Sequence, residues 1–135
     1  MTKLEEMLIE HEGLRFAPYE CTEGYLTIGV GRNLQTVGIS EDEAMLMLQN
    51  DIKRAKDSLK QYEFWGWLDE VRKEALTDFM FNVGAGTFAK FKNMIAALEA
   101  SDFERAASEL LDSRYAKQVG RRAETIASMI RTGER

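Results

Sequence analysis

The stretch that decides the fold runs from Thr2 to Gly31 and reads TKLEEMLIEHEGLRFAPYECTEGYLTIGVG. Thr2 and Glu5 match a capping box, and the apolar residues that follow recur at helical spacing, which predicts a helix of about nine residues ending at Glu12. From Leu14 the pattern changes to short runs of Tyr, Phe, Thr, Ile and Val between glycines, which is typical of small hairpins. The chain is therefore expected to open with a short helix and a small antiparallel sheet.

The rest of the chain carries helical patterns. A second capping box, Ser40 with Glu43, opens a predicted helix of about twenty residues that runs to about Lys60. Beyond an aromatic loop the periodicity predicts helices over about 71–82, 94–98, 101–111 and 123–130. Ser101 is expected to cap the third of these, and the Trp65-Gly66-Trp67 loop is expected to pack beneath the helices. The predicted class is α+β and mainly helical.

Composition limits the classes of function. The 135 residues are 44% hydrophobic with one proline, which predicts a single globular domain over residues 1–135. A net charge of -5 argues against a nucleic-acid binder, although residues 114–135 form a basic end. One cysteine and one histidine leave no internal disulfide, and neither a metal site nor another cofactor is expected. Without a long apolar run, we expect a cytoplasmic chain that does not insert stably into membranes.

Three residues of the opening stretch are candidates for chemistry, and each also has an ordinary explanation. Glu12 lies at the C-terminal end of the first helix, where the helix dipole disfavours a negative charge, and a carboxyl that keeps its proton can act as an acid. It could equally be a surface glutamate. A lone cysteine such as Cys21 is commonly a small buried hydrophobe, and Thr27 alone would be a strand residue. Singly, none of the three establishes a site.

Their spacing is more specific. Eight residues separate Glu12 from Cys21 and five separate Cys21 from Thr27, which resembles the catalytic spacing of the phage-type lysozymes, the endolysins of glycoside hydrolase family 24. The strings MLIEHEGLR at 7–15 and TIGVG at 27–31 are similar to the family's N-terminal lobe. The similarity extends along nearly the whole chain, through Ile39 to Ile52, FNVG at 81–84 and the segment 113–133.

The resemblance implies a two-lobed lysozyme-like fold with a cleft between the lobes. The sheet-bearing lobe would cover about 13–45, an interlobe helix about 41–60, and the helical lobe about 61–135 together with the first helix. The implied activity is hydrolysis of the β-1,4 bond between N-acetylmuramic acid and N-acetylglucosamine in bacterial peptidoglycan, with lysis of the host cell. A lytic transglycosylase or a catalytically inactive peptidoglycan-binding module is the alternative.

The resemblance also implies roles for the candidate residues. Glu12 would donate a proton to the leaving glycosidic oxygen, and Thr27 would position the attacking water on the opposite face, which favours inversion. Cys21 departs from the aspartate of the best-known members, so its role stays open between base, nucleophile and electrostatic partner. Neighbouring glutamates are expected to raise the pKa of its thiol, whereas Arg15 or Arg32 is expected to lower it.

Four further positions are carried over as substrate-binding residues. Asn33, Phe81 and Asn82 would contact the sugars, and Arg122 would contact the catalytic glutamate. The implied partners are peptidoglycan and a separately made holin, with no nucleic acid. The protein would act as a monomer and stay in the host cytoplasm until it is released to the cell wall.

Overall fold

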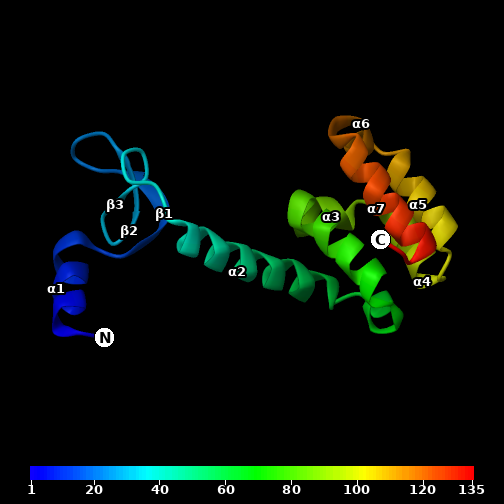
Figure 1. Ribbon diagram of the computed structural model, residues 1–135, viewed down its shortest axis with the longest axis horizontal. Helices are drawn as coiled ribbons and strands as arrows, with labels where there is room; N and C mark the ends of the chain where they lie inside the picture. The colour runs from blue at the N-terminus through cyan, green and yellow to red at the C-terminus, as the bar shows by residue number, and fades with distance from the viewer. The chain divides into compact units, whose positions relative to one another are not determined.

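A computed structural model describes residues 1–135 (Figure 1). It contains seven α-helices, one 3-10 helix and a three-stranded antiparallel sheet, so the predicted α+β, mainly helical class is confirmed. The elements are α1 Lys3–Glu12, β1 Arg15–Glu20, β2 Leu26–Gly29, β3 Arg32–Asn33, α2 Glu41–Leu59, η1 Glu63–Trp67, α3 Glu70–Ala89, α4 Lys92–Glu99, α5 Phe103–Leu111, α6 Arg114–Val119 and α7 Arg121–Thr132. None of these helices is both long and apolar enough to cross a membrane.

The contacts divide the chain into two compact units, Met1–Met47 and Leu48–Arg135, and each is described by itself. The predicted assignment of the first helix to the helical lobe stays a prediction.

Local hydrogen bonds define α1 at both ends. The predicted capping box is present, because the backbone N–H of Thr2 donates to the Glu5 carboxylate at 2.9 Å and the N–H of Glu5 donates to the Thr2 hydroxyl at 3.0 Å. At the other end Gly13 has φ 83°, and its N–H donates to the carbonyl of Ile9 at 2.8 Å. Glycine tolerates this positive φ, so the helix ends directly after Glu12.

The sheet has the order β1-β2-β3, and all its pairs are antiparallel. Tyr19 pairs with Thr27 on one side, and Thr27 pairs with Asn33 on the other, which makes Thr27 the centre of the sheet. The β1 register shifts between Arg15 and Tyr19, where the chain has Pro18, a residue that cannot donate to a ladder. Thr27 is buried, with 4% of its surface exposed.

An ion pair joins the sheet to the start of α2. The two terminal nitrogens of Arg32 each lie 2.8 Å from a carboxylate oxygen of Glu43, and one of them also donates to the carbonyl of Gly38 at 3.1 Å. Glu43 forms the predicted second capping box with Ser40 as well. The Arg32 guanidinium, followed by the Ser40 donors, lowers the pKa of Glu43 to about 2. The Glu43 carboxylate therefore binds Arg32 of β3 and also caps the N-terminus of α2.

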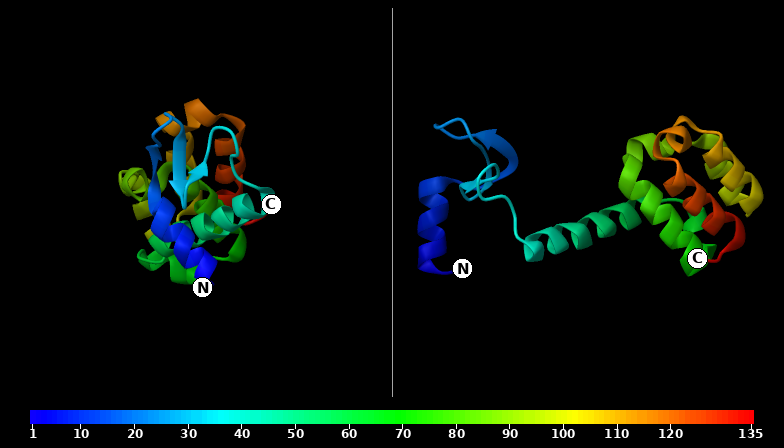
Figure 2. Two further views of the ribbon diagram at one scale, coloured as in Figure 1. Left: turned by 90° about the vertical axis from the view of Figure 1, so that its left-hand side faces the viewer. Right: turned by 45° about the horizontal axis from the view of Figure 1, so that its top comes forward.

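The buried core lies in the second unit, which Figure 2 (right) shows from α3 in green to α7 in red. The ring of Phe79, which is fully buried, lies at its centre, with centroids 5.7 Å from Phe88, 5.0 Å from Phe91 and 4.9 Å from Tyr115. These separations are typical of stabilising aromatic pairs. In the aromatic loop Trp65 packs against this core as predicted, whereas Trp67 is 50% exposed.

The structure refines the predictions for the helices. The predicted end near Asn82 agrees with a break at Gly84, where φ is 82° and ψ is 165°, but a further helical segment, which was not predicted, continues α3 to Ala89. Ser101 does not cap α5; it has φ 55°, and the neighbouring Asp102 accepts the capping hydrogen bond instead. The periodicity did not predict α6, because a helix of six residues spans less than two turns.

Candidate active site

The carboxyl of Glu12 lies beside the turn between β2 and β3. Gly31, with φ 68°, occupies this turn, and a Cβ at that position would lie 2.5 Å from Oε2 of Glu12. A groove of about 270 Å³ runs along the same face of α1, lined by Glu5, Leu8, Ile9, Glu12 and Val30. The absence of a side chain at Gly31 is therefore what lets the Glu12 carboxyl occupy its place.

Cys21 and Thr27 belong to one hydrogen-bonded cluster in the same unit. The backbone N–H of Cys21 donates to the carbonyl of Tyr25 at 2.9 Å, and the Thr27 hydroxyl donates to the same carbonyl at 2.9 Å. Because the Cys21 backbone and the Thr27 side chain share one backbone carbonyl, the β1–β2 hairpin holds the two residues together.

The environment of the thiol favours the thiolate. The backbone N–H of Tyr25, followed by that of Glu23, lowers the pKa of Cys21 below its usual value, and partial burial opposes this effect. The expectation that the Glu23 charge raises the pKa is correct in direction, but this effect is the smallest of those acting on the thiol.

The two arginines expected to lower the pKa of Cys21 are engaged elsewhere. Arg32 binds Glu43, and the Arg15 guanidinium lies 4.7 Å from the ring centroid of Tyr19. The pKa of Cys21 is lowered by backbone N–H groups of the hairpin turn instead of these arginines. The sequence did not predict these donors, because every residue except proline has a backbone N–H.

Asn33 uses part of its side chain for the turn. Its amide oxygen accepts hydrogen bonds from the backbone N–H groups of Gln35 at 2.9 Å and Thr36 at 3.0 Å. Such an Asx turn leaves the amide NH₂ group for a ligand. Gln35 itself, which sequence reasoning missed, accepts from the backbone N–H of Leu26 at 2.6 Å.

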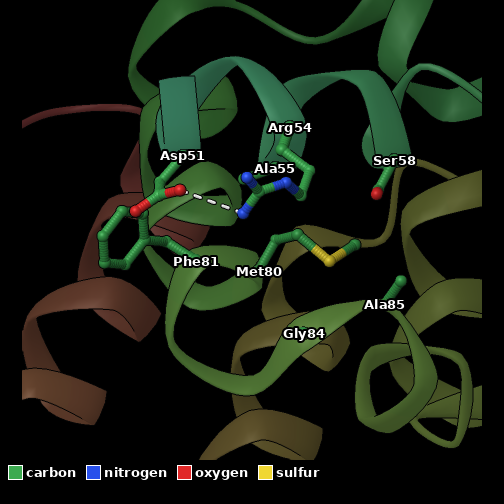
Figure 3. Close-up of a pocket in the computed structure, with 8 residues that line it drawn as sticks. All are labelled: Asp51, Arg54, Ala55, Ser58, Met80, Phe81, Gly84 and Ala85. Atoms are coloured by element: carbon green, nitrogen blue, oxygen red, sulfur yellow. Dashed lines mark hydrogen bonds and ion pairs between the residues drawn. The ribbon is translucent and has the colours of Figure 1, made fainter. Parts of the chain in front are cut away.

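Phe81 and Asn82 lie on α3 just before its interruption, in the second unit. The Phe81 side chain is 44% exposed and lines a pocket of about 260 Å³ between α2 and α3 (Figure 3). Its other lining residues are Asp51, Arg54, Ala55, Ser58, Met80, Gly84 and Ala85, and Figure 3 shows the 2.9 Å ion pair of Asp51 with Arg54 at one side of the pocket. An exposed aromatic ring beside polar groups is suited to contact a sugar.

Arg122, at the start of α7, pairs with an acid that the sequence did not predict. Its Nε donates to the Asp78 carboxylate at 2.8 Å, and a terminal nitrogen donates to the Asp78 carbonyl at 3.4 Å. The predicted contact of Arg122 with Glu12 stays a prediction. No group of three or more His, Cys, Asp or Glu side chains is arranged to hold a metal ion.

Comparison with known proteins identifies the class. Residues 9–131 match the phage lysozyme family, and the chain therefore belongs to that family. The matched range contains Glu12, Cys21 and Thr27, the three residues whose spacing along the chain resembles the family's catalytic residues.

The individual relatives are distant. The chain is 30% identical to a pre-baseplate central spike protein of Enterobacteria phage T4, over 96% of this chain but 28% of that protein. It is 27% identical to a probable T4-type lysozyme of Dictyostelium discoideum, over 98% of this chain and 96% of the relative. An endolysin of Acyrthosiphon pisum secondary endosymbiont phage 1 is also 27% identical, over 86% of this chain and 80% of the relative. The chain thus spans a lysozyme-sized relative nearly completely and less than a third of the spike protein.

Proposed function

We propose that this protein is a lysozyme that hydrolyses the β-1,4 bond between N-acetylmuramic acid and N-acetylglucosamine in peptidoglycan. The observation that carries the proposal is the Tyr25 carbonyl that accepts from both the Cys21 backbone N–H and the Thr27 hydroxyl, in the unit whose first helix ends at Glu12. Membership of the phage lysozyme family supports the same reading.

In the proposed reaction Glu12 acts as the general acid. Expulsion of an alkoxide is prohibitive, so a carboxyl must protonate the glycosidic oxygen as the bond breaks and an oxocarbenium-like centre develops. Glu12 is the last residue of α1, and its carboxyl lies beside Gly31 in the turn between β2 and β3.

Cys21 and Thr27 activate the water in this proposal. The Thr27 hydroxyl already donates its proton to the Tyr25 carbonyl, so its oxygen is free to accept a hydrogen bond from water and orient it. Thr27 cannot also remove the proton from that water. The Cys21 thiolate, which backbone N–H donors favour, is the base beside it. Attack of this water on the face opposite Glu12 inverts the anomeric configuration.

The sugar contacts are proposed from exposed groups. Asn33 offers its amide NH₂, Phe81 offers a ring for stacking, and Asn82 adds an exposed amide. Arg122 offers guanidinium donors beyond those that bind Asp78. In the cell we propose that the protein is a monomer that stays in the host cytoplasm until a separate holin opens the membrane, and that it then lyses the host.

Product analysis on purified peptidoglycan tests the proposal. We expect the wild type to release hydrolysed muropeptides whose first-formed anomer is inverted. Glu12→Gln is expected to lose nearly all activity, whereas Glu10→Gln, a matched change on the same helix, retains it. Cys21→Asp is expected to stay active, because a carboxylate can serve as the base, and Cys21→Ala to lose activity.

Each other outcome has a definite meaning. Products lighter by one water would identify a lytic transglycosylase and refute hydrolysis. Binding of peptidoglycan by the wild type without release of products would identify an inactive binding module. Full activity of Glu12→Gln would end the assignment of the acid.

A further inference from the structure

Both polar groups of the Leu26 backbone are paired with the loop after β3. The carbonyl of Leu26 accepts a hydrogen bond from the backbone N–H of Leu34 at 2.8 Å. Its N–H donates instead to a side chain, the amide oxygen of Gln35, at 2.6 Å. Because β3 ends at Asn33, the Gln35 side chain takes the part that a strand carbonyl has in a regular ladder.

The Leu26 N–H belongs to the peptide group that also contains the Tyr25 carbonyl. That carbonyl accepts the hydrogen bonds of the Thr27 hydroxyl and the Cys21 backbone N–H. Gln35 therefore holds one end of a planar group whose other end holds the candidate catalytic pair. A hydrogen bond to the N–H also polarises the peptide group and strengthens the bonds that its carbonyl accepts.

The position of Gln35 is itself defined by the turn. The Asn33 side-chain oxygen accepts the backbone N–H of Gln35, which fixes where the Gln35 side chain starts. Gln35 is exposed, so it does not belong to the buried core. The hydrogen bond from the Leu26 N–H at 2.6 Å is the specific polar contact of the Gln35 side chain.

We propose that Gln35 is a positioning residue, which fixes the peptide group whose carbonyl oxygen orients Thr27. This inference rests on the proposed function for its effect on catalysis. Its effect on the geometry of the Cys21–Thr27 pair does not depend on any activity.

Gln35→Met tests the proposal, because methionine matches glutamine in length and lacks the amide oxygen. Gln35→Glu keeps an oxygen acceptor, and Gln61→Met makes the same change at an exposed position elsewhere. Three quantities are measured: amide hydrogen exchange at Leu26, the pH dependence of alkylation of the single cysteine, and kcat and KM on peptidoglycan.

For Gln35→Met we expect faster exchange at Leu26, while the other amides of the sheet keep their protection. The alkylation midpoint of Cys21 rises, since its backbone donors are held less firmly. A typical hydrogen bond corresponds to a factor of about three to ten, so kcat falls by that factor while KM stays within about twofold. Gln35→Glu restores kcat and Leu26 protection, and Gln61→Met matches the wild type. If Gln35→Met destabilises the chain, Gln35→Ala is measured in its place.

Unchanged exchange at Leu26 together with an unchanged alkylation midpoint in folded Gln35→Met overturns the proposal. A general loss of protection with equal loss in Gln35→Glu also overturns it, because that pattern indicates a merely structural role. If the wild type has no activity, the proposed function fails, while exchange and alkylation still decide the role of Gln35.

Discussion

Replacement of Gly31 by alanine is expected to displace the Glu12 carboxyl. The added Cβ would lie 2.5 Å from Oε2 of Glu12, whereas ordinary contact begins at 3.4 Å, so the oxygen has to move by about 0.9 Å, the difference of the two distances. Because Oε2 ends a flexible side chain, this movement costs little stability. A catalytic group misplaced by about 1 Å can cost about a hundredfold in rate, and we expect a fall in kcat of that order.

Gly38→Ala is the matched control. Gly31 and Gly38 share φ 68°, so alanine costs each variant about 1–2 kcal/mol of backbone strain. The nearest atom to a Cβ at Gly38 is the Leu34 carbonyl oxygen at 3.9 Å, which is an ordinary contact. Release of reducing ends from peptidoglycan gives kcat, and urea denaturation gives the free energy of unfolding. Equal kcat values for the two variants would refute the reasoning, since strain alone would then explain both.

Three further predictions follow from single contacts. The Arg72 side chain is 16% exposed and donates to the carbonyls of Ile130 at 2.6 Å and Arg131 at 3.0 Å, near the end of α7. Its guanidinium carbon also lies 3.8 Å from the ring centroid of Phe103. Arg72→Ala is therefore expected to lower the free energy of unfolding by about 3 kcal/mol. Arg54→Ala, which removes an exposed ion pair, lowers it by at most about 1 kcal/mol in the same urea titration, and equal losses would contradict the role of Arg72. The pKa of Glu43 falls from 4.5 to about 2 on folding, so the stability that this carboxylate contributes is complete above pH 4.5 and is lost as the pH falls towards 2. Glu43→Gln is therefore expected to lose less stability than the wild type over that pH range. Equal losses of unfolding free energy in the two proteins, measured by urea denaturation at each pH, would contradict the prediction. The backbone N–H of Tyr25, followed by that of Glu23, lowers the pKa of Cys21. Alkylation of Cys21 is therefore expected to have its midpoint at a lower pH than alkylation of free cysteine, and a midpoint at or above that of free cysteine would contradict the role of these donors.

Predictions from sequence succeeded where hydrogen bonds are local. The capping boxes at Thr2 and Ser40 each join residues three apart, so the residue types alone reveal them. The same reasoning failed at Ser101, because the adjacent Asp102 offers a competing acceptor and the chain path decides which of the two caps α5. The break at Gly84 was located, but not the continuation of the helix beyond it.

The sequence by itself determined the class of fold, the family and the three candidate residues Glu12, Cys21 and Thr27, because these depend on spacing along the chain. Only the tertiary structure decided what surrounds them. The donors to the Cys21 thiol are backbone N–H groups, and the acid that pairs with Arg122 lies 44 residues away in the chain. Such partners depend on how the backbone turns and which helices pack together, and the spacing of residues along the chain predicts neither.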